Sequence, residues 1–227
     1  LEVDIIMQRS EQTIKVWDPL IRLFHWSLAL AFIIAYITGE DESNTHAYAG
    51  YVILGLITFR ILWGFIGTTY ARFSNFMYSP ETTMEYLKSL LSTGPKHYLG
   101  HNPAGGIMVI LLLVALLAAS FTGLKAYGVE GHGPLSADAT SISLISAAYA
   151  DDDDDHDEDE HEDEEYESGE DEKDEFWEEV HEGTVNFLLL LVILHVLGVI
   201  VSSHLHGENL VRAMITGRKQ ADAEIQT

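Results

Sequence analysis

Four long apolar stretches dominate the pattern of hydrophobic and polar positions along the chain. They run over residues 20–38, 47–66, 105–126 and 184–203. About 20 predominantly apolar residues in a helix are enough to cross the hydrocarbon core of a bilayer. The third and fourth stretches contain runs, 107–121 and 187–201, without any Asp, Glu, Lys or Arg. The pattern therefore predicts an all-α integral membrane protein, a bundle of four transmembrane helices in a lipid bilayer.

The polar segments between these stretches divide the chain. We expect an N-terminal segment over residues 1–19, three transmembrane helices over 20–127 with a loop at 67–104, an acidic loop over 128–180, the fourth helix and its end over 181–219, and a tail over 220–227. The loop at 67–104 has a helix start of its own at Ser79-Pro80-Glu81, which supplies an N-cap, a first-turn proline and an early acid.

The distribution of Lys and Arg predicts the orientation, because cytoplasmic loops carry an excess of both. Basic residues fall in the N-terminal segment, in the loop at 67–104 and in the C-terminal tail. The connection between the first two stretches has none, and the connection between the last two has only Lys173 beyond the edge residue Lys125. Both termini should therefore be cytoplasmic in a bacterial cytoplasmic (inner) membrane, with the acidic loop on the periplasmic side.

That acidic loop holds most of the charge. The 227 residues carry a formal net charge of −24, and 21 of the 36 acidic residues lie in the window from Asp151 to Glu179. A segment so poor in apolar residues is expected to be disordered. Two roles stay open for it: a docking surface for a basic redox partner, since complementary charge speeds association, or a solvated spacer. A chain this acidic is also a poor match for nucleic acid, whose phosphates need clustered Lys and Arg.

The absence of cysteine excludes iron–sulfur clusters, thiolate zinc sites and covalently attached haem. Histidines inside the membrane are therefore the candidate functional residues, because an ionisable residue within a transmembrane helix indicates a functional site by default. His25 and His195 lie within the first and fourth stretches at the predicted cytoplasmic level, whereas His46 and His181 lie at the outer level. His181 and His195 are 14 residues apart, which is about 21 Å along one helix, on nearly the same face.

The alternating direction of the helices predicts two level-matched pairs, His25/His195 and His46/His181. Two stacked pairs of neutral imidazoles are the axial ligands that two six-coordinate haem irons require. Small residues near the proposed haem planes would let a porphyrin approach the backbone, although they also serve ordinary helix packing. These are Gly39, Gly50, Gly55, Gly123 and Gly198.

Arg22 and Arg60 lie at the cytoplasmic level, where each either binds haem propionates or reaches the membrane interface. Histidines in the loops, and those that follow the apolar run of the fourth stretch, are predicted not to be ligands. They include His97, His101, His132, His204 and His206.

Short motifs flank the stretches. They are Val16-Trp17-Asp18-Pro19, Arg22, His25-Trp26, the segment from His46 to Tyr51, Gly100-His101-Asn102-Pro103, Gly105-Gly106, Gly131-His132-Gly133-Pro134-Leu135, His181-Glu182, His195, and the segments 208–211 and 214–219. With these motifs the chain resembles the bacterial di-haem 561-type cytochrome b family, which includes the b-type cytochrome subunit of nickel–iron hydrogenases. The resemblance covers about residues 15–219 apart from the acidic window, which departs from the family.

The resemblance implies two b haems whose iron ligands would be His25, His46, His181 and His195. It also implies electron transfer between the membrane quinone pool and a periplasmic redox partner, either a c-type cytochrome or a hydrogenase. Whether the protein only carries electrons or is the subunit of an oxidoreductase that reduces quinone or oxidises quinol stays open. A relative that oxidises superoxide would prefer a cationic outer surface, which the acidic loop does not offer.

Two other classes of function compete with this one. A divalent-metal transporter would explain the histidines within the acidic window, His156 and His161. The cores of the four stretches contain no Asp or Glu, however, and cations crossing a bilayer usually meet carboxylates there. A non-redox membrane anchor subunit would have no need of level-matched histidines.

Overall fold

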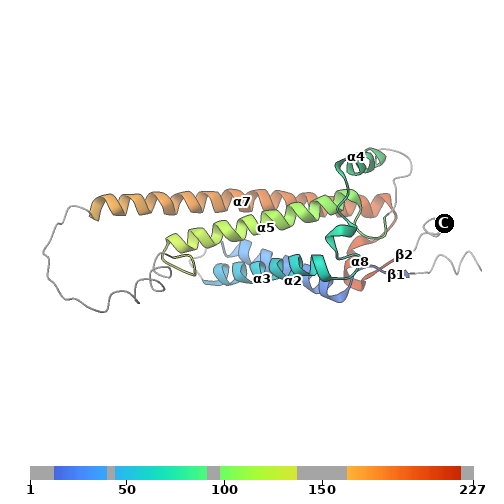
Figure 1. Ribbon diagram of the computed structural model, residues 1–227, viewed down its shortest axis with the longest axis horizontal. Helices are drawn as coiled ribbons and strands as arrows, with labels where there is room; N and C mark the ends of the chain where they lie inside the picture. Colours follow the sequence, from blue (N-terminus) through green and yellow to red (C-terminus); the bar gives the residue numbers. More distant parts are fainter. Residues whose placement is uncertain (1–12, 40–43, 91–97, 137–162, 221–227) are drawn as a thin grey trace, which may run out of the picture.

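The computed structural model describes residues 13–39, 44–90, 98–136 and 163–220, and most of them are helical (Figure 1). Within these ranges four helices are long and apolar enough to cross a membrane. They are α2 (Pro19–Ile37), α3 (Asn44–Ile66), α5 (Pro103–Val129) and α7 (Asp163–Leu205), the last over its part Glu175–Leu205. The prediction of an all-α membrane bundle is confirmed.

Polar side chains fix where several helices begin. The Asp18 carboxylate accepts a hydrogen bond from the backbone N–H of Ile21 at 2.9 Å, directly before the first-turn proline of α2. Asn102 does the same for α5, accepting from Gly105 at 2.7 Å. Ser79 caps the short helix α4 (Pro80–Ser89), so the helix predicted within the loop is present. Each cap satisfies a backbone donor that the helix itself leaves free.

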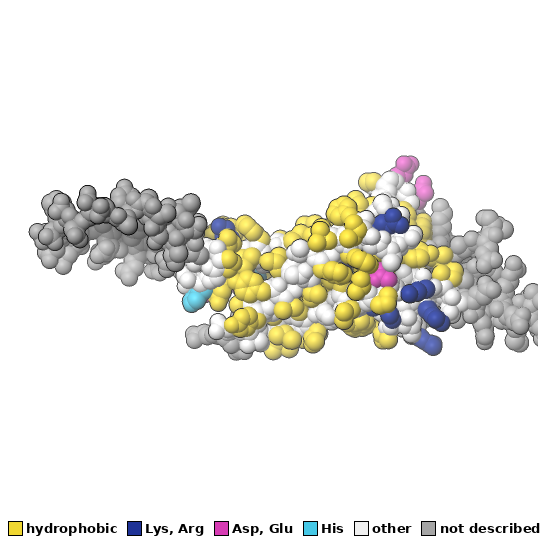
Figure 2. All heavy atoms as spheres, turned by 60° about the horizontal axis from the view of Figure 1, so that its bottom comes forward, with side chains coloured by type: hydrophobic (Ala, Val, Ile, Leu, Met, Phe, Trp, Pro, Cys, Tyr) yellow, Lys and Arg dark blue, Asp and Glu magenta, His cyan; other side chains and the backbone are white. Residues whose placement is uncertain are grey.

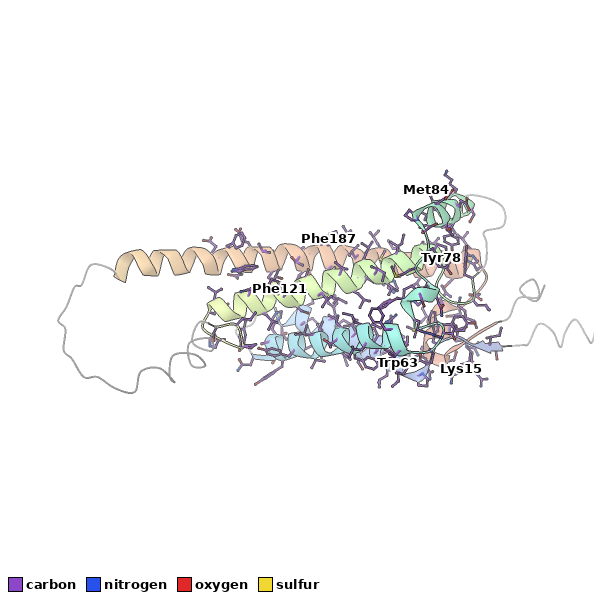
Figure 3. All side chains as sticks on the ribbon, viewed as in Figure 1. Lys15, Trp63, Tyr78, Met84, Phe121 and Phe187 are labelled. Atoms are coloured by element: carbon purple, nitrogen blue, oxygen red, sulfur yellow. The ribbon has the colours of Figure 1, made fainter. Side chains whose placement is uncertain are left out.

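The four long helices pack in sequence order, with α2 against α3, α3 against α5 and α5 against α7. Their shared core is apolar and includes Ile57 and Leu188, which are 0% and 1% exposed. The outward faces are apolar too: Phe121 on α5 and Phe187 on α7, labelled in Figure 3, are each 53% exposed. Hydrophobic side chains cover much of the visible surface of the long helices in Figure 2. A bundle that is apolar both inside and outside suits lipid as its surroundings.

The first and last described segments of the chain meet at one end of the bundle, which we call the terminal end. Strand β1 (Thr13–Lys15) pairs antiparallel with β2 (Arg218–Gln220), next to helix α8 (Leu210–Thr216) and the 3-10 helix η1 (Phe73–Asn75). The carbonyl of Gly217 accepts from the N–H groups of Val16 and Trp17, and Gly217 itself has φ +80°, a conformation that glycine adopts without strain. Lys and Arg side chains gather at this end in Figure 2.

The opposite end, where α7 begins, is called the acidic end. Here the expectation of a disordered acidic loop is wrong for residues 163–179, because α7 starts at Asp163 and continues without a break to Leu205. Glutamate has a good helix propensity, and extending an existing helix avoids the cost of nucleating a new one. In Figure 1 this part of α7 projects beyond the other helices. Residues 151–162 of the acidic window lie outside the described residues.

Candidate functional site

The intramembrane histidines meet in two pairs. The ring centres of His25 on α2 and His195 on α7 are 6.4 Å apart, and those of His46 on α3 and His181 on α7 are 6.0 Å apart. These are the two pairs that the sequence predicts. Because α7 packs on α5, both pairs join α7 to helices on the other side of the bundle, one pair at each end.

Both separations suit a metal ion held between two imidazoles. Each metal–nitrogen bond is about 2 Å, so two imidazoles on opposite sides of one ion place their ring centres about 6 Å apart. The measured values of 6.4 and 6.0 Å lie at that distance. The pairs consist of histidines alone, which is the donor set of a bis-imidazole haem. The residues present therefore fit a haem iron at each pair.

The acidic-end pair borders a cavity of about 80 Å³. Apart from the two histidines, the cavity is lined mainly by small and apolar side chains of α3 and α5, among them Gly50, Leu54, Ala119, Gly123 and Leu124. A Cβ atom at Gly123 would lie 2.9 Å from Cε1 of His181, whereas one at Gly50 would meet nothing within 4 Å.

The other glycines predicted to accommodate a porphyrin differ in their surroundings. A Cβ atom at Gly39 would lie 3.8 Å from Cε1 of His46, while Gly55 and Gly198 face open space within 4 Å. Glycine is thus needed for ring approach at Gly123, and the open positions leave room along α3 and α7.

Hydrogen bonds set the tautomer of the acidic-end pair. Nδ1 of His46 lies 2.9 Å from the carbonyl oxygen of Ala35, and a carbonyl only accepts, so Nδ1 carries the hydrogen. Nδ1 of His181 lies 3.0 Å from Oγ1 of Thr122, whose hydroxyl donates to the Ala119 carbonyl at 3.1 Å. His181 is therefore the donor to Thr122. In both neutral rings Nε2 is left with its lone pair free for a metal.

The terminal-end pair has different neighbours. The Nδ1 atom of His25 is buried and has no hydrogen-bond partner among the described residues. The Trp26 ring stands edge-on to the His25 ring at 5.2 Å.

Arg60 is buried at this same end, with only 3% of its surface exposed. Its guanidinium lies 4.9 Å from the centre of the Phe73 ring and 5.9 Å from that of Phe76. Within the described part of the chain its Nη1 atom has no hydrogen-bond partner. Such burial does not fit an arginine that reaches the lipid interface. The carboxylate of Asp18 acts on Arg60 electrostatically, and the unsatisfied Nη1 donor among the described residues favours a further anionic ligand.

Arg22 joins two elements of the terminal end. One guanidinium nitrogen donates to the carbonyl of Ile215 at the end of α8. Its Nε atom is buried and unpartnered within the described ranges. Arg22 therefore has one nitrogen in a structural contact and another without an acceptor in the described part of the chain.

Asp18 anchors the start of α2 to the end of α3. Besides capping α2, its carboxylate accepts from Oγ1 of Thr68 at 2.6 Å and from Nε1 of Trp63 at 3.3 Å. Burial raises the pKa of the Asp18 carboxyl, but these hydrogen bonds together outweigh burial and leave the pKa below its ordinary value. Trp63 lies at the terminal end in Figure 3.

The surroundings of His101 could not be predicted from the sequence. Its ring packs against Trp17 at 4.6 Å and Phe76 at 4.4 Å between ring centres. Burial, with help from the charges of Arg60 and Lys219 and from His195, lowers the pKa of His101 to about 3, so it is neutral at physiological pH. Its place within the motif Gly100-His101-Asn102-Pro103 was the available signal. His97, His156 and His161 lie outside the described residues.

Comparison with known proteins identifies the family of this bundle. A family model described as prokaryotic cytochrome b561 matches residues 16–217. The chain belongs to the prokaryotic cytochrome b561 family. As a member of the b561 family with four apolar helices, it is a multi-pass membrane protein, and the family implies haem b. The resemblance predicted from the motifs is confirmed.

The b561 chain also has individual relatives. It is 28% identical over 155 residues to a probable Ni/Fe-hydrogenase B-type cytochrome subunit of Azotobacter vinelandii, a match that covers 55% of this chain and 63% of the relative. A protein of the same description from Bradyrhizobium diazoefficiens is 23% identical over 240 residues, covering 92% of this chain and 86% of the relative. The chain thus spans less than two thirds of the first relative. No solved structure matches the chain.

Proposed function

We propose that this b561-family protein is a di-haem cytochrome in which His25 and His195 hold one haem b iron and His46 and His181 hold the other. The observation that carries the proposal is the separation of the rings, 6.4 and 6.0 Å, at two levels of one bundle. Bound haem would supply a one-electron carrier at each level. The family assignment favours this function over a metal transporter or a non-redox anchor.

The protein's own residues orient the cofactors and keep water away. The hydrogen bonds from His46 to Ala35 and from His181 to Thr122 hold those rings with Nε2 free. Buried nitrogens of Arg60 and Arg22 that have no partner among the described residues are proposed to bind the propionates of the terminal-end haem. The apolar core and lipid-facing side chains between the two levels exclude solvent.

The proposed orientation places the terminal end in the cytoplasm and the acidic end in the periplasm of a bacterial inner membrane. The gathering of Lys and Arg at the terminal end supports this orientation. Electrons would then cross between the quinone pool and a periplasmic redox protein, a hydrogenase or a c-type cytochrome. The description of the relatives as hydrogenase cytochrome subunits supports the hydrogenase.

The test of the di-haem proposal is the ratio of haem to purified full-length protein. We expect two haems with reduced b-type absorption bands, and one haem after His195→Ala or His46→Ala. The control is His132→Ala, since His132 lies in an exposed turn and stacks on Tyr127. A protein without haem, or a ratio that neither histidine variant lowers, would refute the proposal.

The acidic segment is proposed to dock a basic partner. Glu175, Glu178 and Glu179 are exposed on α7 directly before the level of His181. Complementary charge accelerates association most at low ionic strength. We expect the triple replacement of these residues by Gln to slow reduction by a candidate partner at low salt and to flatten its salt dependence. An unchanged rate across salt concentrations would leave the segment as a spacer.

A further inference from the structure

The two histidine pairs differ in what their Nδ1 atoms contact. At the acidic end, His46 has an acceptor in Ala35 O at 2.9 Å. His181 has Thr122 Oγ1 at 3.0 Å, and the backbone carbonyl of Ala119 is a further hydrogen-bond partner. At the terminal end, Nδ1 of His25 is buried without a partner in the described structure. We propose that Thr122 is a positioning residue that lowers the reduction potential of the acidic-end haem below that of the terminal-end haem. This inference rests on the di-haem function proposed above.

The Thr122 hydroxyl is placed to accept a hydrogen bond from the imidazole of His181. It is 7% exposed, and its single hydroxyl hydrogen is used in the bond to the carbonyl of Ala119, three residues earlier in α5. Only its lone pairs therefore face the imidazole. Because this part of α5 is an apolar, membrane-spanning segment, water does not compete for the bond and its strength is retained.

An acceptor on Nδ1–H makes the other nitrogen of the ring a stronger donor to a metal. A more electron-rich ligand stabilises ferric over ferrous iron, and hydrogen bonding around axial ligands is one of the ways in which a protein sets a haem potential. The carbonyl of Ala35 acts on His46 in the same direction, so both rings of the acidic-end pair favour the oxidised state.

The terminal end favours the opposite state. The buried guanidinium of Arg60 lies there, and arginine keeps its charge in proteins. A nearby positive charge stabilises the ferrous haem, which carries one negative charge more than the ferric haem. Nδ1 of His25 also lacks an acceptor among the described residues, so this ligand and the charge both favour a higher potential at this end.

Two neighbouring residues of α5, Thr122 and Gly123, contact His181 in different ways. Gly123 leaves room for the ring, since a Cβ there would lie 2.9 Å from Cε1, and Thr122 accepts from Nδ1. Loss of the hydroxyl should therefore change the electronic state of the ligand without closing the space in which the ring lies.

The experiment is a redox titration of the reduced b-type bands in the purified full-length protein. Thr122→Val has nearly the same shape but no acceptor, while Thr122→Ser keeps the hydroxyl. We expect two transitions in the wild type, a raised lower potential in the Val variant and a nearly unchanged one in the Ser variant. A roughly tenfold change in the relative affinity for ferric and ferrous iron equals about 59 mV for one electron. Thr58→Val is the matched control, because the Thr58 hydroxyl donates to the carbonyl of Leu54 on its own helix and has no other hydrogen bond within the described residues.

The outcomes separate this inference from the di-haem proposal. Absence of haem from the wild type refutes the proposed function. If both proteins bind two haems and Thr122→Val leaves both potentials unchanged, or shifts both by the same amount, the role of Thr122 is refuted. The di-haem proposal then still stands. The Val variant could lose its acidic-end haem. In that case Thr122→Cys, which keeps a weak acceptor, is expected to raise the lower potential. An unchanged lower potential in the Cys variant overturns the inference.

Discussion

Gly123 on α5 lies so close to His181 on α7 that a Cβ atom at position 123 would be 2.9 Å from Cε1 of the imidazole. Atoms rarely come that close, so a side chain here must displace the ring or the helix. The ring is held by its bond to Thr122 and has little freedom to move away without losing that bond. One glycine thus controls whether the acidic-end pair forms.

The first prediction concerns this contact. Gly123→Val should displace His181 and lower the haem content from two to one per chain, as judged from the reduced absorption spectrum and protein concentration. Gly183→Val is the matched control, because a Cβ at Gly183 on α7 would meet nothing within 4 Å. Equal haem content in both variants would mean that His181 does not need the space beside Gly123.

The second prediction concerns Asp18, whose carboxylate binds Ile21, Thr68 and Trp63. Asp18→Ala removes an N-cap, at a cost of about 1 kcal/mol, and leaves the Trp63 and Thr68 donors unpaired, at about 1–3 kcal/mol more. The thermal midpoint in detergent should fall clearly.

Ser79→Ala provides the comparison for Asp18, since Ser79 caps only the short helix α4 and is exposed. Its midpoint should fall less. The pH dependence has a definite sign: the pKa of Asp18 is lowered on folding, so its stabilising effect is present above the ordinary value of 3.8 and is lost as the pH falls through the lowered value.

The third prediction concerns His101, whose pKa falls from 6.5 to about 3 on burial. Between these values the unfolded chain binds a proton that the folded chain does not, so the folded state loses stability as the pH falls below 6.5. The loss reaches about 2 kcal/mol at pH 5. His101→Phe should therefore show a smaller drop in thermal midpoint between pH 7.5 and pH 5 than the wild type. His132→Phe, in an exposed turn, should behave as the wild type does, and an equal drop in all three proteins would contradict the assignment.

The fourth prediction concerns Lys219 in β2. Its ammonium lies 3.1 Å from Glu208, with both side chains almost buried, and donates to the carbonyl of Tyr98. Removing one partner of a buried ion pair costs about 3–5 kcal/mol, so Lys219→Met should destabilise the terminal end and speed proteolysis of the C-terminal segment. Arg218→Met, at the exposed neighbouring position, should have little effect. The double variant Lys219→Met with Glu208→Gln should recover part of the loss.

Much of the fold could be predicted because its signals are local. Apolar length defines the four spans, and Asp18, Ser79 and Asn102 stand before prolines as helix caps do. The histidine pairs could also be predicted, since alternating helix direction puts His25 level with His195 without knowledge of any side-chain contact.

The remaining features depend on contacts between segments that are distant in the chain. The His101 ring packs against Trp17 and Phe76. Its motif marks the residue but does not indicate these two contacts. The acceptor for His181 comes from Thr122, 59 positions away. The composition of residues 163–179 predicted disorder, but this segment is helical. A charged segment that would not fold alone here extends a helix already stabilised by packing.

Helix α7 carries His181 and His195 on one uninterrupted element. Their separation, about 21 Å along the axis, follows from the rise of the helix and from no tertiary contact. In the proposed cytochrome the tunnelling distance between the two irons would be fixed in the same way. Displacement of α2 or α3 would remove one ligand of a pair and with it the haem proposed there. The spacing of His181 and His195 on α7 would not change. Insertion or deletion of one residue between His181 and His195 would change that spacing by about 1.5 Å and turn the two ligands about 100° relative to each other, so that both could no longer face their partner histidines.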